Sequence, residues 1–400
     1  MQRWAATMRW GGLAGMLALA CGAPGGETTG PGSTGSDETT DEPGSGTTTG
    51  SDGTTVAGNP TTDGGSEGVD DTTTTGEPPL GTGGIWISIE EVMALPTSGA
   101  AWDELLAVAM QGPGVPNLSD QDQDDNVMVL AKALVCVRLD DGALCDEVRA
   151  SVMAAMETEN GGRTLALGRE LLAYVVAADL VGLSDADDAM FRAWLADVIH
   201  EDLEGRTLVT THEDRPNNWG THAGASRVAV AVYLGDQAEM DRCADVFHGW
   251  LGDRQTYAGF AYGDLWWQSD PSNPVGINPV GATIMGENVD GVLPDDQRRG
   301  GPFAWPPPQE NYVYEALQGA IAQAVILHRR GHDVWNWEDQ ALLRAYLWLD
   351  QQASYPAAGD DTWQMHLVNH YYGTTLPAPE VASSGKNMGW TDWTHAAPAP

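Results

Sequence analysis

Apolar residues recur at three- and four-residue spacing in one segment after another from residue 100 onward. This is the period of an α-helix that buries one face. Short links containing Gly, Asp or Pro separate most of these segments, and helices joined by short links pack as antiparallel pairs. The sequence therefore predicts an all-α fold, with helices over residues 100–111, 126–139, 143–157, 163–180, 186–203, 221–234, 237–251, 311–330 and 338–353.

We expect these antiparallel helix hairpins to close, wholly or partly, into an (α/α) toroid. No sequence repeat of fixed period is visible, which argues against an open solenoid. Residues 84–89 are expected to form a short extended lead-in. Two long stretches, 252–310 and 355–400, lack the helical period and are rich in aromatic residues, Gly and Pro. Irregular segments of this length are usually functional, so we expect them to form the active-site loops.

The amino terminus has the pattern of a lipoprotein leader. Arg3 and Arg9 precede a short apolar run, residues 11–20, which is followed by Cys21. This pattern is typical of a secretory signal peptide, and the run is too short to span a bilayer as a helix. We predict a signal peptide over residues 1–21 and lipidation of Cys21. The protein would then be secreted across the inner membrane and lipid-anchored to the outer membrane or cell surface, with no other membrane contact.

Residues 22–84 are predicted to be a disordered linker, because Gly, Thr, Ser, Pro and acidic residues leave almost no apolar surface to bury. The remaining residues, 85–400, are enough for one large domain. Of the net charge of −38, the leader arginines contribute +2 and the eleven acids of the linker −11, which leaves −29 for residues 85–400. So acidic a domain is not expected to bind nucleic acid.

Three cysteines remain beyond the leader. Cys136 and Cys145 flank a turn between two predicted helices and could form a disulfide in an oxidising compartment. Their spacing matches no zinc site. Cys243 lies inside an apolar helical pattern, which favours a buried free thiol.

The stretch 215–236 places polar side chains at the start of an apolar, alanine-rich helix. If that helix begins near Asn218, then Asn218 and His222 are four residues apart and share a face. With Trp219 between them, an amide, an indole and an imidazole are presented together, which suits a carbohydrate or carboxylate site. The alternative is an asparagine cap followed by a buried histidine.

Tryptophan in irregular surroundings is the second indication of a carbohydrate site. Indole faces stack on sugar rings, while nearby amides and carboxylates bind hydroxyl groups. The alternative is that Trp fills the core between helices, as we expect for Trp194, Trp250 and Trp348. The tryptophans in polar, irregular segments are Trp219, Trp266, Trp267, Trp305, Trp363, Trp390 and Trp393.

Three segments, in order along the chain, resemble the alginate lyase family of polysaccharide lyases. The first, residues 217–222 (Asn-Asn-Trp-Gly-Thr-His), is similar to that family's Asn-Asn-His-Gly-Thr segment. The second, residues 290–299, is similar to its Asp-Gly-Ser-x-Pro-Glu-Glu-x-x-Arg run, whose arginine falls on Arg299. The third is a helix that opens with Tyr312 and is followed by Gly-His-Asp-Val-Trp, where the family has Gly-x-Asp-Leu-Trp. The resemblance spans roughly residues 215–349, and the family fold is an (α/α) toroid.

The resemblance implies β-elimination on a uronic-acid polysaccharide, without a cofactor or a metal ion. A base removes the proton beside the sugar carboxylate, and the glycosidic oxygen leaves. By position, Asn218 and Arg299 would neutralise the carboxylate, while Tyr312 would act as acid and His222 would take part in proton transfer. We expect substrate contacts from Asn217, Trp219, Trp266, Trp267, Arg298, Trp305, Tyr314, Lys386 and Trp390.

The sequence departs from the family pattern at two places. Trp219 stands where the family has its histidine, so His222 would have to supply the imidazole from the next turn. The interval between Arg299 and Tyr312 is longer than in the family, and Tyr314 therefore competes for the acid role. The acidic domain is unfavourable for a polyanion, although a patch of Arg215, Arg298, Arg299 and Lys386 could offset this.

Two other functions stay open. A toroid glycoside hydrolase could use two acids of the irregular segments, or the domain could bind carbohydrate without catalysis. For any single acid, solvated surface or a bound calcium is the simpler interpretation. The histidines near the carboxyl end have no zinc-site spacing and are expected in the core or facing substrate. These acids and histidines are Asp264, Glu287, Asp290, Asp360, Asp361, His366, His370 and His395.

Overall fold

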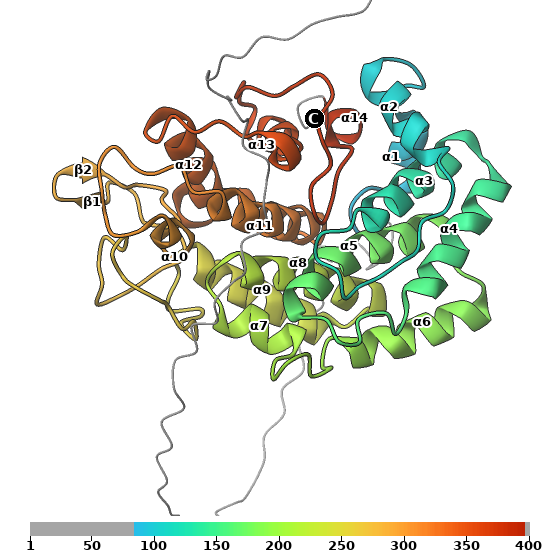
Figure 1. Cartoon of the computed structure of the whole chain (residues 1–400), viewed down its shortest axis with the longest axis horizontal. Helices are drawn as coiled ribbons and strands as arrows, with labels where there is room; N and C mark the ends of the chain where they lie inside the picture. The colour runs from blue at the N-terminus through green and yellow to red at the C-terminus, as the bar shows by residue number, and fades with distance from the viewer. Residues whose placement is uncertain (1–83, 397–400) are drawn as a thin grey trace, which may run out of the picture. The chain divides into compact units, whose positions relative to one another are not determined.

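The computed structural model describes residues 84–396 (Figure 1). The predicted signal peptide, Cys21 and all of the predicted linker except Gly84 lie outside the described residues. No helix within the described range is long and apolar enough to cross a membrane.

The described part of the chain is mostly helical and has almost no strand, which confirms the all-α prediction. One small antiparallel sheet pairs β1 (Thr283–Ile284) with β2 (Glu287–Asn288). The helices are α1 (Ile89–Ala94), α2 (Ala100–Ala109), α3 (Asp125–Leu139), α4 (Gly142–Ala155), α5 (Thr164–Val181), α6 (Asp185–Val198), α7 (Leu208–Asp214), α8 (Asn218–Leu234), α9 (Gln237–Leu251), α10 (Pro294–Gln297), α11 (Tyr312–Arg329), α12 (Trp337–Gln351), α13 (Gln364–Tyr372) and α14 (Thr391–Thr394), with 3-10 turns η1 (Arg298–Gly300), η2 (Val334–Asn336) and η3 (Gly359–Asp361).

Each of the nine predicted helices is present with ends close to those expected, and α9 matches its predicted range at both ends. The prediction of an extended lead-in at residues 84–89 was wrong, because the described residues 84–88 form bends rather than a strand and α1 begins at Ile89. The short helices were not predicted, because each contains too few apolar residues to show a helical spacing. Two of them do carry a local signal, since Ser88 before α1 and Thr207 before α7 each form a capping box. Helix α13 also interrupts the carboxyl stretch that was expected to be irregular.

Helix α8 lies between α5 and α11 and is buried at every residue from Asn218 to Ala231 (Figure 1). Glycine makes this packing possible on both sides. A Cβ on Gly168 of α5 would lie 2.9 Å from the backbone nitrogen of Ala223, and one on Gly319 of α11 would lie 2.3 Å from the carbonyl carbon of Thr221. The backbones of the three helices therefore approach closely at the level of α8's first two turns.

The carboxyl-terminal segment crosses from α11 to α3. The backbone N–H of Lys386 donates to Gln318 Oε1 at 3.0 Å, and Asn126 Nδ2 donates to the Lys386 carbonyl at 2.9 Å. The Trp390 indole then donates to the Val127 carbonyl at 3.0 Å. Residues far apart in sequence are thereby joined at one end of the helix array.

The cysteine predictions are settled by the fold. Cys136 at the end of α3 and Cys145 in α4 form a disulfide across the predicted turn, with Cα atoms 5.3 Å apart. Cys243 in α9 is a buried free thiol, as expected from its apolar pattern.

Replacing Gly319 with alanine tests the close contact of α8 with α11. Since the added methyl group would meet backbone rather than a flexible side chain, Gly319→Ala should lower the free energy of unfolding by about 1–3 kcal/mol. Urea unfolding followed by circular dichroism measures this. Gly142→Ala is the matched control, because nothing lies within 4 Å of its Cβ position. Equal stability of the two variants would contradict the close contact.

Candidate functional site

Two fully buried polar side chains on α8 lack hydrogen-bond partners. Asn218 is the first residue of the helix and His222 lies one turn later, and both are 0% exposed. The amide oxygen and nitrogen of Asn218 and both ring nitrogens of His222 accept or donate no hydrogen bond, and the nearest acid to the imidazole is Glu315, 3.9 Å from His222 Nε2. Buried polar atoms are nearly always paired in folded proteins, so an unpaired amide next to an unpaired imidazole indicates a site completed by a ligand or by water.

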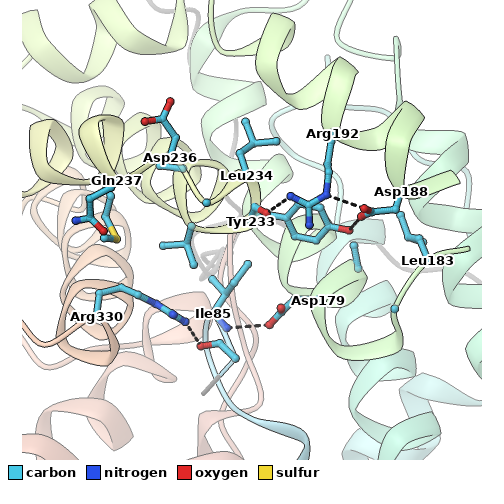
Figure 2. A pocket seen from close by; sticks show the side chains of 17 residues that line it. Ile85, Asp179, Leu183, Asp188, Arg192, Tyr233, Leu234, Asp236, Gln237 and Arg330 are labelled. Carbon is cyan, nitrogen blue, oxygen red and sulfur yellow. Dashed lines mark hydrogen bonds and ion pairs between the residues drawn. The ribbon is translucent and has the colours of Figure 1, made fainter. Parts of the chain in front are cut away.

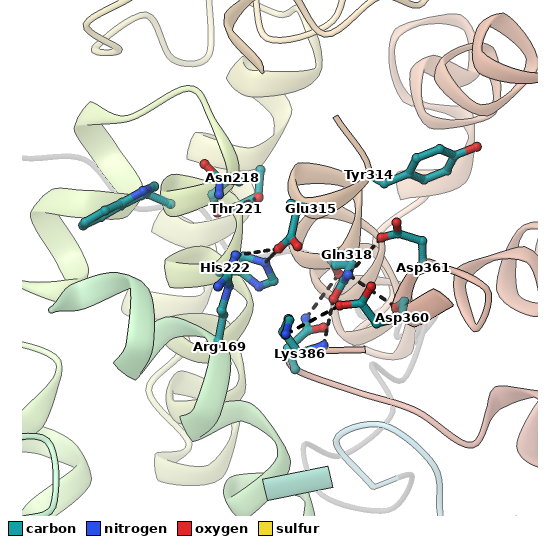
Figure 3. A network of polar contacts seen from close by, with 12 residues as sticks. Arg169, Asn218, Thr221, His222, Tyr314, Glu315, Gln318, Asp360, Asp361 and Lys386 are labelled. Carbon is teal, nitrogen blue, oxygen red and sulfur yellow. Dashed lines mark hydrogen bonds and ion pairs between the residues drawn. The ribbon is translucent and has the colours of Figure 1, made fainter. Parts of the chain in front are cut away.

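A buried ion pair borders this imidazole (Figure 3). Arg169 Nη2 of α5 lies 2.5 Å from Glu315 Oε2 of α11, and the same oxygen lies 3.9 Å from His222 Nε2. Burial alone would raise the pKa of Glu315, but the Arg169 guanidinium outweighs it and lowers the pKa to about 2. Burial lowers the pKa of His222 to about 4 despite the nearby carboxylate. The site therefore holds an ionised carboxylate, a guanidinium and a neutral imidazole at pH 7.

The amino end of α8 is joined to the turn that carries Arg299. The backbone N–H of Asn218 donates to Asp296 Oδ1 of α10 at 3.0 Å. Burial raises the pKa of Asp296 well above its usual value. Three residues later, the Arg299 guanidinium lies 4.1 Å from the centre of the Tyr312 ring. Tyr312 begins α11, one turn before Glu315. These contacts link the turn that carries Arg299 to the first residue of α8 and to the first residue of α11.

The two candidate tyrosines differ in surroundings. Tyr314 is buried, and its hydroxyl donates to the Tyr355 carbonyl at 2.8 Å. Burial also raises the pKa of Tyr314. Tyr312 is only half-buried and contacts Arg299. Of the two tyrosines, Tyr312 is thus the more exposed and Tyr314 has its hydroxyl bound to backbone.

The residues next to Asn218 support the start of the helix. Asn217 is the helix cap, since its side-chain oxygen accepts from the Trp219 backbone N–H at 3.2 Å. Trp219 is mostly buried, and the Arg215 guanidinium lies 4.3 Å from its ring centre. Asn217 therefore caps α8, as the alternative interpretation of this segment expected of an asparagine. The Trp219 ring packs against the Arg215 guanidinium.

Besides Trp219, four of the tryptophans expected to contact sugar are buried packing residues in this structure: Trp267, Trp363, Trp390 and Trp393. Trp267 is 0% exposed and its indole donates to the Gly301 carbonyl, while buried Trp390 binds the Val127 carbonyl. Trp266 is 43% exposed and Trp305 is half-buried, so these two offer accessible ring surface.

Of the predicted basic contacts, Arg298 is paired with Asp295 at 3.1 Å. Lys386 Nζ lies 3.7 Å from Asp360 Oδ2 and is part of the network in Figure 3. Within this network, Gln318 Nε2 donates to Asp361 Oδ1 at 3.0 Å. Asp360 and Asp361 were candidates for a hydrolase pair. In this structure they bind Lys386 and Gln318, and so hold the carboxyl-terminal segment near α11.

Sequence reasoning missed Arg169, Glu315 and Gln318. A signal for them was present, because each is a polar residue inside an otherwise apolar helical segment, at a position the period assigns to the core. A charge at such a position needs a partner.

A pocket of about 470 Å³ lies elsewhere, toward the carboxyl ends of α5 and α8 (Figure 2). Its polar groups pair among themselves. Asp188 accepts from Arg192 at 2.6 Å and from the Tyr233 hydroxyl at 2.7 Å, and Asp179 accepts from the Ile85 N–H at 2.8 Å. None of the predicted site residues lines it.

The histidines near the carboxyl end do not form a metal site in the described range. His366, His370 and His395 do not belong to a group of three donors; His366 Nε2 instead lies 2.9 Å from the Pro379 carbonyl. A group that does bring three donors together is His248, Asp253 and Glu338. It is built from different elements than the α8 site.

The fold and the site thus define an all-α domain with a buried amide, imidazole and guanidinium at the ends of three close-packed helices. Residues 156–259 match the family model described as alginate lyase. This match confirms the resemblance expected from the sequence, and it contains Arg169, Asn218 and His222 but ends before Arg299 and Tyr312. No curated protein matches the chain.

Burial of neutral His222 should make stability depend on pH. Its pKa is about 4 in the folded protein against 6.5 for an exposed histidine, so the unfolded chain binds the proton more readily. The stability that neutral His222 contributes is fully present above pH 6.5. As the pH falls from 6.5 toward 4, the unfolded chain takes up the proton first, and the free energy of unfolding drops by about 3 kcal/mol. His222→Gln should flatten this part of the curve of unfolding free energy against pH. Exposed His200→Gln is the control, and parallel curves for His222→Gln and wild type would contradict the assignment.

Proposed function

We propose that residues 85–400 form an (α/α) toroid domain that cleaves a uronate-containing, alginate-like polysaccharide by β-elimination. The observation that carries this proposal is the unpaired, buried amide and imidazole of Asn218 and His222, located inside the segment that matches the alginate lyase family. A binding site for a sugar carboxylate needs such groups, held on rigid backbone and without competing partners.

Carboxylate neutralisation is the first requirement of this chemistry, because the proton beside the sugar carboxylate is only weakly acidic. The Asn218 amide can donate to one carboxylate oxygen, and the Arg299 guanidinium can add a charge-assisted hydrogen bond. Both would stabilise the negative charge that develops when the proton leaves. Their low-dielectric surroundings strengthen these contacts.

Proton transfer is the second requirement. His222 is neutral at pH 7 because burial lowers its pKa, so its imidazole is able to accept a proton. Tyr312 would donate a proton to the leaving glycosidic oxygen. The Arg299 guanidinium, 4.1 Å from the ring centre, favours negative charge on the phenol during that step. Since Asn218 and His222 are fully buried, turnover requires the residues that cover them to move.

A non-catalytic carbohydrate-binding protein is the second candidate. The observation that favours it is Trp219, which occupies the family's histidine position and packs beneath Arg215. The hydrolase alternative has less support, since Asp290 is bound by Arg344 at 2.5 Å and by the Gly281 N–H. For the cellular location, lipid anchoring through Cys21 remains our proposal.

The choice between the two tyrosines gives the sharpest test of the lyase. Tyr312→Phe should lower kcat by about a hundredfold or more, because the general acid is removed while the ring stays over Arg299. Formation of the unsaturated uronate, followed by its ultraviolet absorbance with alginate, polyglucuronate and glycosaminoglycans, measures this. Tyr314→Phe, whose hydroxyl is bound to the Tyr355 carbonyl, is the control and should keep most of its turnover.

Three outcomes would decide against the lyase. Reducing sugar released without an unsaturated product would indicate a hydrolase. Polymer binding with no turnover at any pH would indicate the binding protein. Full activity in Tyr312→Phe would remove Tyr312 from the mechanism.

A further inference from the structure

An imidazole and two carboxylates meet where α9 ends and α12 begins. His248 lies in the last turn of α9, Asp253 follows that helix, and Glu338 is near the start of α12. One donor atom from each lies within 4.8 Å of the others. His248 Nε2 is 3.2 Å from Glu338 Oε1, and His248 Nδ1 is 3.8 Å from Asp253 Oδ2.

Local structure holds each of these donors in place. The backbone N–H of Asp253 donates to the His248 carbonyl at 3.2 Å, which folds the chain back onto α9 after Gly252. The His248 ring stacks on Trp337, with ring centres 4.5 Å apart. The Arg344 guanidinium donates to the Glu338 carbonyl at 3.0 Å. The three side chains are therefore presented from fixed backbone on three separate stretches of chain.

We propose that His248, Asp253 and Glu338 bind a divalent transition-metal ion of the zinc class. One imidazole and two carboxylates are a donor set that suits Zn²⁺ with water in the remaining position, whereas Ca²⁺ and Mg²⁺ prefer oxygen ligands alone. An ion would also offset the repulsion between two carboxylates held close together in a strongly acidic chain.

The site is accessible from solvent. The side chains are one quarter to one third exposed, at 26% for His248, 25% for Asp253 and 35% for Glu338. Asp253 and Glu338 also line a cavity of about 430 Å³ that gives an ion a path of entry.

A bound ion would fasten the long loop to the helix array. Residues 252–310, which end near Tyr312 and contain Arg299, start at this site, and Arg344 ties the same loop to α12 through Asp290 and the Asn278 carbonyl. Metal binding would therefore stabilise the loop at its first residues. This role is independent of whether the domain is a lyase.

Equilibrium dialysis of the full chain against Zn²⁺, with elemental analysis, tests the proposal, and thermal unfolding gives a second readout. The wild type should retain one Zn²⁺ per chain and unfold at a higher temperature when Zn²⁺ is present. Glu338→Gln and Asp253→Asn should each weaken Zn²⁺ binding by about tenfold or more. Asp245→Asn, an exposed acid on the same helix, is the matched control and should bind like the wild type.

Absence of Zn²⁺ binding by the wild type would overturn the proposal. Equal Zn²⁺ binding by the wild type and by both variants would overturn it as well, because the ion would then lie elsewhere. If one of the two variants fails to fold, the other still tests the proposal, because it should unfold at the same temperature with and without Zn²⁺.

Discussion

The close packing of α8 against α5 and α11 is the constraint on which the rest of the site depends. Gly168 and Gly319 leave no side chain between the helices, so backbone meets backbone along the first turns of α8. Polar residues that face this contact have no route to bulk water. The Asn218 amide has no hydrogen-bond partner there, and the His222 imidazole has only the Glu315 carboxylate, 3.9 Å from its Nε2.

The Arg169–Glu315 ion pair lowers the energetic cost of burying charge beside His222. A lone charge beside His222 would be costly at this depth, but a guanidinium 2.5 Å from a carboxylate compensates both charges. The carboxylate still lies 3.9 Å from the imidazole, close enough to stabilise an imidazolium formed during a reaction. The same burial keeps the imidazole neutral at rest, so the residue is set up to gain a proton rather than to hold one.

Local patterns predicted most of the helices, because a helix that buries one face has apolar residues at three- and four-residue spacing, and this spacing is visible in the sequence. Helix α8 was predicted over residues 221–234 and begins three residues earlier, at Asn218, where Asn217 forms the cap that local chemistry offered as the alternative interpretation. Arg169 and Glu315 could not be paired from sequence, since 146 residues separate them and no local rule sets which helices touch. For the same reason Trp267 and Trp390 were expected at substrate, although long-range contacts bury both.

Trp219 and His222, three residues apart on α8, have different neighbours in this fold. The Arg215 guanidinium lies 4.3 Å from the centre of the Trp219 ring. His222 lies on the face of Asn218, one turn along, and its Nε2 is 3.9 Å from Glu315 Oε2 across the α8–α11 contact. The amide and the imidazole therefore share one side of the helix, and the imidazole has an ionised carboxylate beside it, because the effect of burial on the pKa of Glu315 is outweighed by the Arg169 guanidinium, which lowers that pKa to about 2.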